Sequence, residues 1–121
     1  MEAQKVNLVI NQGAKFDQTV LVKDRATGDA RDLTGFTARM QARTDLDAVT
    51  TLFDLNSEGV GAALTLGGVA GTVRILIPAS ATTAYTWEQG RYDLKITPAD
   101  VSQAERVLQG YVVVKREVTH E

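Results

Sequence analysis

Residues 32–43 read Asp-Leu-Thr-Gly-Phe-Thr-Ala-Arg-Met-Gln-Ala-Arg, a turn signal followed by strict alternation of apolar and polar side chains. Successive side chains of a β-strand point to opposite faces, so this alternation predicts a strand with one apolar and one polar face. The apolar face carries Phe36, Ala38, Met40 and Ala42. The polar face carries Thr37, Arg39, Gln41 and Arg43. The stretch therefore predicts a strand that covers a core on one side only.

A second stretch, Gly90 to Ile96, repeats this pattern, with Tyr92, Leu94 and Ile96 on its apolar face. Further strands are predicted at 5–10, 16–23, 50–55, 62–66, 72–77 and 105–117. The glycines of 67–71 close the strands at 62–66 and 72–77 into a hairpin. Pro78 ends the ladder, because proline has no backbone N–H, and the alanines of 79–85 favour a short helical turn.

These elements amount to seven or eight short strands, with turn signals about every eight to twelve residues. This pattern is typical of an all-β, two-sheet antiparallel sandwich with one short helical turn near residues 79–85. An α/β fold requires amphipathic helices between the strands, and only the region around Ala81 is a candidate for one. The length of 121 residues predicts a single domain over 1–121, with a short polar tail at 118–121.

The composition excludes several classes of protein. With 44% hydrophobic and 23% charged residues the chain is in the ordinary globular range, and the absence of cysteine excludes disulfides and thiolate metal sites. The net charge of −2 argues against a nucleic-acid partner, because phosphate binding needs a clustered basic face. The apolar runs are far too short for a membrane helix, and the first residues do not resemble a secretory signal. We therefore expect no membrane partner and synthesis in a cytoplasm.

Catalytic and metal-binding patterns are absent from the sequence. His120 is the only histidine and stands next to the last residue, where a side chain is usually solvated. Asp45 and Asp47 lack the neighbouring oxygen ligands that a calcium loop supplies. No serine lies in a Gly-x-Ser-x-Gly turn, and the glycines of 67–71 are not followed by the Lys-Ser/Thr of a phosphate-binding loop. We expect no enzyme, no catalytic or metal-binding residues and no cofactor.

Trp87 follows Tyr85 at the end of the irregular segment, and it has two interpretations. Its indole either stacks on a sugar or fills a partner's pocket, or it closes one end of the sandwich core. We favour the core position, because a small β-domain with so few aromatic residues needs large side chains to close its ends.

Six segments carry a resemblance to a known family. They are Val6-Asn7-Leu8, Gly13-Ala14-Lys15-Phe16, Asp32 to Met40, Gly71-Thr72-Val73-Arg74-Ile75, Gly90-Arg91-Tyr92-Asp93-Leu94 and Leu108-Gln109-Gly110-Tyr111-Val112-Val113. Their arrangement resembles small tail-associated proteins of bacteriophages, and it is similar to the N-terminal immunoglobulin-like domain of phage baseplate upper proteins. The resemblance implies an immunoglobulin-like sandwich that acts as a virion structural protein of the tail, baseplate or neck. It brings no catalytic residues with it.

On this interpretation the chain is a protein–protein assembly module in the virion, made in the cytoplasm of the bacterial host. Its expected partners are other virion structural proteins, and it is expected to form a homo-oligomer within the particle. The first and last strands are the candidate docking edges, since an unpaired strand edge can extend a neighbour's sheet. The candidate interface residues are Val6, Leu8, Ile10, Arg39, Arg43, Trp87, Tyr111, Val113 and Val118. The alternatives are a capsid decoration protein and a small carbohydrate-binding module, the latter suggested by Tyr85 and Trp87.

Overall fold

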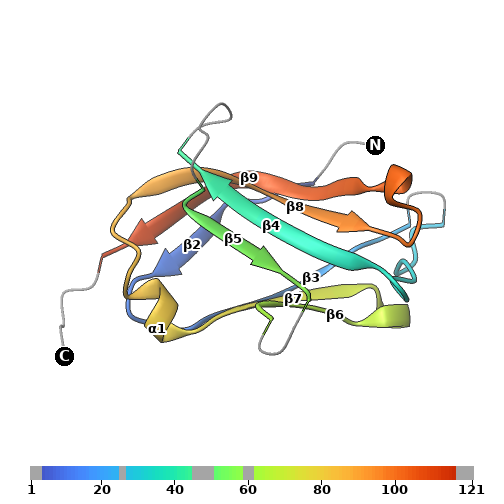
Figure 1. The fold of residues 1–121 in the computed structure, drawn as a ribbon, viewed down its shortest axis with the longest axis horizontal. Helices are drawn as coiled ribbons and strands as arrows, with labels where there is room; N and C mark the ends of the chain where they lie inside the picture. Colours follow the sequence, from blue (N-terminus) through green and yellow to red (C-terminus); the bar gives the residue numbers. More distant parts are fainter. Residues whose placement is uncertain (1–3, 25–26, 45–50, 59–61, 117–121) are drawn as a thin grey trace.

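The structure is a computed structural model that describes residues 4–24, 27–44, 51–58 and 62–116. Two β-sheets pack face to face in it, with the larger sheet above the smaller one in Figure 1. The predicted two-sheet sandwich is therefore confirmed. No helix in the described part of the chain is long and apolar enough to span a lipid bilayer.

The larger sheet has six strands in the order β1-β9-β8-β4-β5, with β2 also paired to β9. Its strands are β1 (Gln4–Lys5), β2 (Leu8–Asn11), β4 (Thr37–Arg43), β5 (Phe53–Asn56), β8 (Gln89–Thr97) and β9 (Glu105–Lys115). The alternating segments identified in the sequence, β4 and β8, lie side by side and antiparallel, with Met40 opposite Leu94.

The smaller sheet has three strands in the order β3-β7-β6. They are β3 (Phe16–Leu21), β6 (Leu64–Leu66) and β7 (Thr72–Ile77). The predicted hairpin is confirmed, since β6 and β7 pair antiparallel around a short 3₁₀ turn, η1 (Gly68–Ala70). The predicted helical turn is α1 (Ala79–Thr82), which connects the two sheets, and a second 3₁₀ turn, η2 (Val101–Gln103), precedes β9.

The two terminal strands differ from the prediction. The expected first strand over 5–10 is divided into β1 and β2, which both pair parallel with β9 and are the exception to antiparallel pairing. The last strand was expected to be a docking edge, and this is wrong. β9 pairs with β8 along one edge and with β1 and β2 along the other, so its backbone groups are used on both sides.

The core lies between the sheets and follows the predicted alternation. Ala38, Met40 and Ala42 on β4 are at most 4% exposed, and the inward side chains of β8 are equally buried. The smaller sheet contributes its own inward side chains, among them Val73 and Ile75, to the same cluster. The alternating pattern therefore determines which face of each strand is buried.

A buried polar contact holds α1 against the body of the domain. The Thr82 side chain is completely buried, and its hydroxyl donates to the Ala14 carbonyl at 2.9 Å. The same oxygen accepts a hydrogen bond from the Gly13 N–H at 3.1 Å. Both partners lie in the turn between β2 and β3, so this threonine joins the connection between the sheets to the N-terminal strands.

Candidate functional site

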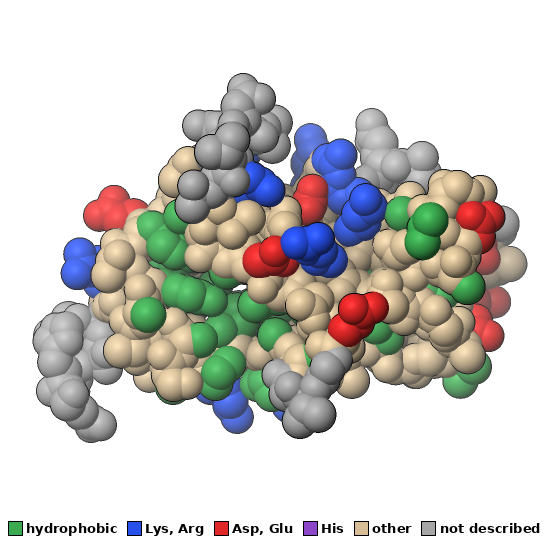
Figure 2. Space-filling model, in the orientation of Figure 1, with side chains coloured by type: hydrophobic (Ala, Val, Ile, Leu, Met, Phe, Trp, Pro, Cys, Tyr) green, Lys and Arg blue, Asp and Glu red, His purple; other side chains and the backbone are tan. Residues whose placement is uncertain are grey.

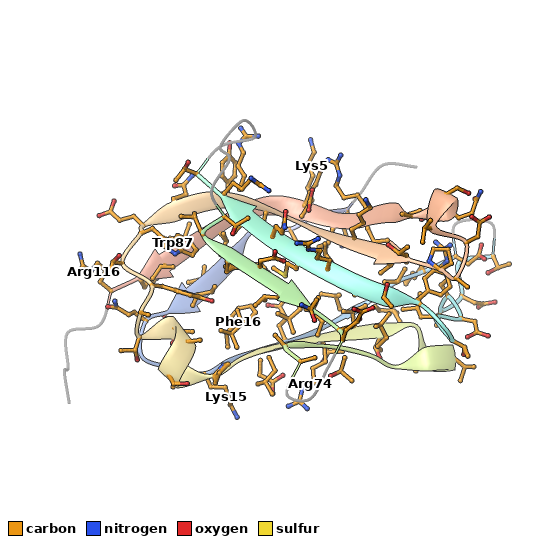
Figure 3. The ribbon with its side chains drawn as sticks, viewed as in Figure 1. Lys5, Lys15, Phe16, Arg74, Trp87 and Arg116 are labelled. Carbon is orange, nitrogen blue, oxygen red and sulfur yellow. The ribbon has the colours of Figure 1, made fainter. Side chains whose placement is uncertain are left out.

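The outer face of the six-stranded sheet carries a groove of about 530 Å³. Its walls come from β1, β4, β8 and β9 and from the bend between β1 and β2. The lining residues are Lys5, Asn7, Gln41, Arg43, Arg91, Tyr92, Asp93, Arg106, Gln109, Gly110 and Tyr111. Figure 2 shows Lys and Arg side chains gathered over the middle of the larger sheet, with acidic side chains among them. In Figure 3, Lys5 points away from the sandwich on this side, whereas Arg74 lies on the opposite side.

The strand register brings the polar side chains of the groove together. Arg43 on β4 lies opposite Arg91 on β8, which lies opposite Tyr111 on β9. A second row, two residues along each strand, contains Gln41, Asp93 and Gln109, with Lys5 opposite Gln109. Side chains directly opposite on neighbouring strands are about 5 Å apart, so each row is a set of adjacent groups. Four segments far apart in the sequence thus form one surface.

Arg91 and Tyr111 form the centre of the first row. The Arg91 guanidinium lies 5.0 Å from the centroid of the Tyr111 ring, within range of a cation–π interaction. Arg91 Nη2 also donates to the Tyr111 hydroxyl at 2.9 Å. Arg91 has no salt bridge to any described carboxylate. The pair therefore fixes a guanidinium on the surface without neutralising its charge.

The charge of the groove is unbalanced. Its lining includes four cationic side chains, Lys5, Arg43, Arg91 and Arg106, and one carboxylate, Asp93. The Asp93 carboxylate lies 3.7 Å from Arg106 Nε, so part of the negative charge is already engaged. The whole chain has a net charge of −2. The groove is therefore a positive surface on a weakly acidic protein.

The bend between β1 and β2 forms the end wall of the groove. Asn7 Oδ1 accepts a hydrogen bond from the Tyr111 N–H at 3.1 Å, and the Tyr92 hydroxyl donates to the Val6 carbonyl at 2.6 Å. Gly110 lies against this bend, where a Cβ atom would collide with the Val6 carbonyl. Burial raises the pKa of Tyr92, so its hydroxyl keeps its proton and remains a donor at neutral pH.

An ion pair lies beside the groove on β4 and β5. Arg39 binds the Asp54 carboxylate through two hydrogen bonds of 3.0 and 2.6 Å, and Gln41 donates a third at 3.0 Å. The hydrogen bond from Arg39 is the main reason that the pKa of Asp54 lies below its ordinary value. Arg39 is thus compensated within the domain, unlike Arg91 and Lys5.

The predicted interface residues lie in different environments. Arg43 and Tyr111 line the groove, Arg39 is next to it, and Val113 is partly exposed on β9. Leu8 and Ile10 are at most 2% exposed and belong to the core, so their prediction as contact residues is corrected. Val6 is half-buried against the core. Val118 and the tail at 118–121 lie outside the described residues, as do Asp45, Asp47 and His120.

Trp87 packs at one end of the core. Its ring centroid lies 5.5 Å from that of Tyr85 and 6.2 Å from that of Phe53, and the side chain is half-buried. Figure 3 shows it at the end of the sandwich near α1, away from Lys5. The structure agrees with the core position favoured from the sequence, and Trp87 takes no part in the groove.

Sequence reasoning missed four of the groove residues, Lys5, Arg91, Arg106 and Gln109. The sequence shows that they lie on polar strand faces, but it does not show which strands are neighbours in the sheet.

A second groove, of about 680 Å³, lies at the Leu33–Thr37 turn and has only uncharged residues in its lining. Within the described ranges, no three His, Cys, Asp or Glu side chains gather to hold a metal ion. The charged groove is therefore the candidate site.

Comparison with known proteins identifies the fold. No protein-family model matches the chain, and no curated protein is similar to it in sequence. Among solved structures, the chain is similar to the extracellular domain of the voltage-gated sodium channel beta4 subunit, described as a parallel homodimer in cell–cell adhesion. The identity is 10%, the TM-score is 0.50, and the match covers 98% of this chain and 97% of that one. A sodium channel beta-subunit structure from a study of multimeric cell-adhesive interactions matches with 11% identity, a TM-score of 0.49 and coverage of 95% and 98%.

The likeness supports the immunoglobulin-like form of the sandwich. It also overturns the prediction of a virion structural protein of the tail, baseplate or neck. The solved structure described above, which shares the fold over nearly the whole chain, is an extracellular domain of a channel subunit and not a virion component. The prediction is wrong on this finding, together with its alternatives of a capsid decoration protein and a carbohydrate-binding module. At 10% identity the likeness establishes the fold alone, so the adhesive role is that of the channel subunit.

Proposed function

We propose that this chain is a non-catalytic immunoglobulin-like domain that binds another protein on the outer face of its six-stranded sheet. The observation that carries the proposal is the charged groove centred on Arg91 and Tyr111. Arginine and tyrosine are enriched in protein interfaces, and both side chains are held here on a rigid sheet by their mutual contact. A preorganised surface of this kind loses little side-chain entropy on binding.

The acid–base properties of the described groups support binding rather than catalysis. A general acid or base works best with a pKa near the working pH. The hydrogen bond from Arg74 lowers the pKa of Asp17, and that from Arg39 lowers the pKa of Asp54, while burial raises the pKa of Tyr85 and Tyr92. Each of these shifts moves the pKa of the group further from neutral pH. The carboxylates therefore stay charged and the tyrosine hydroxyls stay protonated, as a binding surface requires.

The test compares capture by matched variants. The wild-type domain, an Arg91→Thr/Tyr111→Thr variant and an Arg74→Thr control are immobilised and exposed to an extract of the cells that produce the protein. Arg74 lies on the opposite face and, like Arg39, is in an exposed ion pair, with Asp17. We expect a protein that the wild type and the control retain and the double variant loses. Equal retention by all three proteins contradicts the proposed face.

A second candidate function, self-association, rests on the edge of β2 that faces away from β9, which pairs with no strand in the described part of the chain. In a parallel pair the hydrogen bonds come from alternate residues, and Val6 and Gln12 direct their N–H groups to β9. By this alternation Val9 directs its N–H away from β9, and its side chain is 47% exposed. Pairing of two β2 edges would extend the sheet across two copies. Sedimentation velocity should then show a dimer that Val9→Pro converts to monomer, and a monomeric wild type would contradict this candidate.

A further inference from the structure

We infer that the groove on the outer sheet face takes an acidic segment of a partner protein in an extended conformation. This inference rests on the proposed binding function and adds the chemistry of the partner. It depends on two cations in particular, Lys5 and Arg91, neither of which forms a salt bridge with any described residue.

Charge is the first argument. A ligand in the groove is within reach of four cationic side chains and one carboxylate, and that carboxylate already faces Arg106. The Debye length at physiological ionic strength is about 8 Å, so the acidic groups elsewhere on the chain are largely screened from the ligand. A negatively charged partner is therefore attracted to the groove although the whole protein is weakly acidic. Two copies of this face would repel each other, which disfavours face-to-face self-association.

Dimensions are the second argument. The groove crosses from β4 over β8 and β9 to β1, four strands spaced about 4.8 Å apart, or roughly 14 Å in all. An extended peptide rises about 3.3 Å per residue, so four or five residues span it. Carboxylates two residues apart then lie on the same side of the peptide, at about 6.6 Å. Two or three of them can reach Arg91, Lys5 and the cations beside them, and arginine binds a carboxylate with two parallel hydrogen bonds.

The groove is less suited to a nucleic acid. Single strands bind on open aromatic rings over which bases stack, but the Tyr111 ring is already occupied by the Arg91 guanidinium. Asp93 lies in the middle of the surface and repels a continuous polyanion. These features favour a short run of protein carboxylates with neutral residues between them.

The experiment measures binding of a fluorescein-labelled peptide of four Thr-Glu repeats by anisotropy, with a peptide of four Thr-Gln repeats as the matched control. We expect the glutamate peptide to bind at least about tenfold more tightly, the loss expected when a hydrogen bond to a charged group is removed. Its affinity should fall severalfold when NaCl is raised from about 50 to about 300 mM, because exposed charges are screened. Equal binding of the two peptides, or no dependence on salt, overturns the inference.

Variants locate the site. Arg91→Thr and Lys5→Gln should each weaken binding of the glutamate peptide severalfold, whereas Arg74→Thr on the opposite face should leave it unchanged. Circular dichroism and thermal melts of each variant verify that it is folded. An equal loss in the Arg74→Thr control would contradict the inference, because it would indicate binding to cationic side chains in general.

Two further outcomes separate the inference from the function on which it rests. A labelled uridine homopolymer or a heparin fragment that binds more tightly than the glutamate peptide would overturn the protein-segment assignment. If the glutamate peptide fails to bind while a cellular protein is still retained by the wild type and lost by the Arg91→Thr/Tyr111→Thr variant, the acidic partner is wrong and the binding function stands. If both measurements fail, the proposed function is wrong as well.

Discussion

The two faces of the six-stranded sheet are made by the same strands and the same alternation, but they depend on the sequence in different ways. Met40 and Leu94 on the inner face are completely buried and belong to one continuous apolar cluster. On the outer face Arg91 and Tyr111 matter through their mutual position, which only the pairing of β8 with β9 provides. The comparison teaches that neighbouring residues of one strand serve the core and the proposed binding surface, so that stability and binding should be separable by mutation.

The largest effect on stability is expected on the inner face. Leu94→Ala removes buried methyl and methylene groups from the centre of β8 and should lower the free energy of unfolding by about 3 kcal/mol, within the range of such deletions. Urea denaturation followed by tryptophan fluorescence measures this. A loss below about 1 kcal/mol would contradict the proposed difference between the two faces, since it would show that the inner face is loosely packed.

A second change tests the boundary between the two faces. Gly110→Ala places a Cβ where the Val6 carbonyl and Asn7 Oδ1 now lie, so the bend between β1 and β2 must move away from β9. We expect a loss of roughly 2 kcal/mol, in the range of other steric changes in packed regions, and a wider groove. Hydrogen exchange of the β1 and β2 amides should accelerate in this variant. Unchanged exchange would show that the close approach does not hold these strands.

The buried residues of the inner face were predictable from the sequence, because the alternation of apolar and polar residues alone decides which side chains face the core. The apolar positions of 36–42 and 92–96, the hairpin around Gly68 and the helical turn at Ala79 all follow from local patterns. The place of β9 inside the sheet did not follow, because an apolar strand with alternating burial has the same pattern at an edge and in the middle. Leu8 and Ile10 were expected at a contact surface because their strand was predicted as a docking edge, but an edge strand still turns one face to the core, and both side chains lie on that face.

The outer face was predictable only in part. Arg43 and Tyr111 were identified as surface side chains, and both line the groove. Lys5, Arg91 and Arg106 were not identified with them, because strand order and register, which bring these residues together, are long-range properties. The fold thus follows largely from single strands, whereas the candidate site needs the assembled sheet.

A smaller effect is expected at Thr82, which joins α1 to the turn between β2 and β3. Thr82→Val keeps the shape of the side chain but leaves the Gly13 N–H without its acceptor, at a cost of about 1–2 kcal/mol in unfolding free energy. Thr83→Val is the matched control, because Thr83 is exposed and its hydroxyl bonds only within the helical turn. Chemical denaturation of both variants checks the difference. Equal losses would show that burial of the hydrogen bond is unimportant here.

On the outer face the expected effect on stability is small. Arg91→Thr removes an exposed cation–π contact and should change the free energy of unfolding by no more than about 1 kcal/mol, while it weakens binding severalfold. Leu94→Ala is the natural comparison, because Leu94 lies three residues along the same strand and on the opposite face of the sheet. A loss in Arg91→Thr as large as that in Leu94→Ala would mean that the outer face also holds the fold together.

The smallest effect is expected on the stability of the protein at acidic pH. Because Arg39 hydrogen-bonds to Asp54, the pKa of this carboxyl is lower in the folded protein than its ordinary value of 3.8. The stability from the ion pair is therefore fully present above the unfolded-state pKa and is lost as the pH falls through the lower folded-state value.

Asp54→Asn should lower the stability at neutral pH slightly and flatten its dependence on pH below about 4. The half-exposed pair is screened by salt, so the difference between the variant and the wild type should shrink at high ionic strength. Parallel stability curves of the two proteins between about pH 2 and 5 would show that Arg39 and Asp54 do not interact in solution.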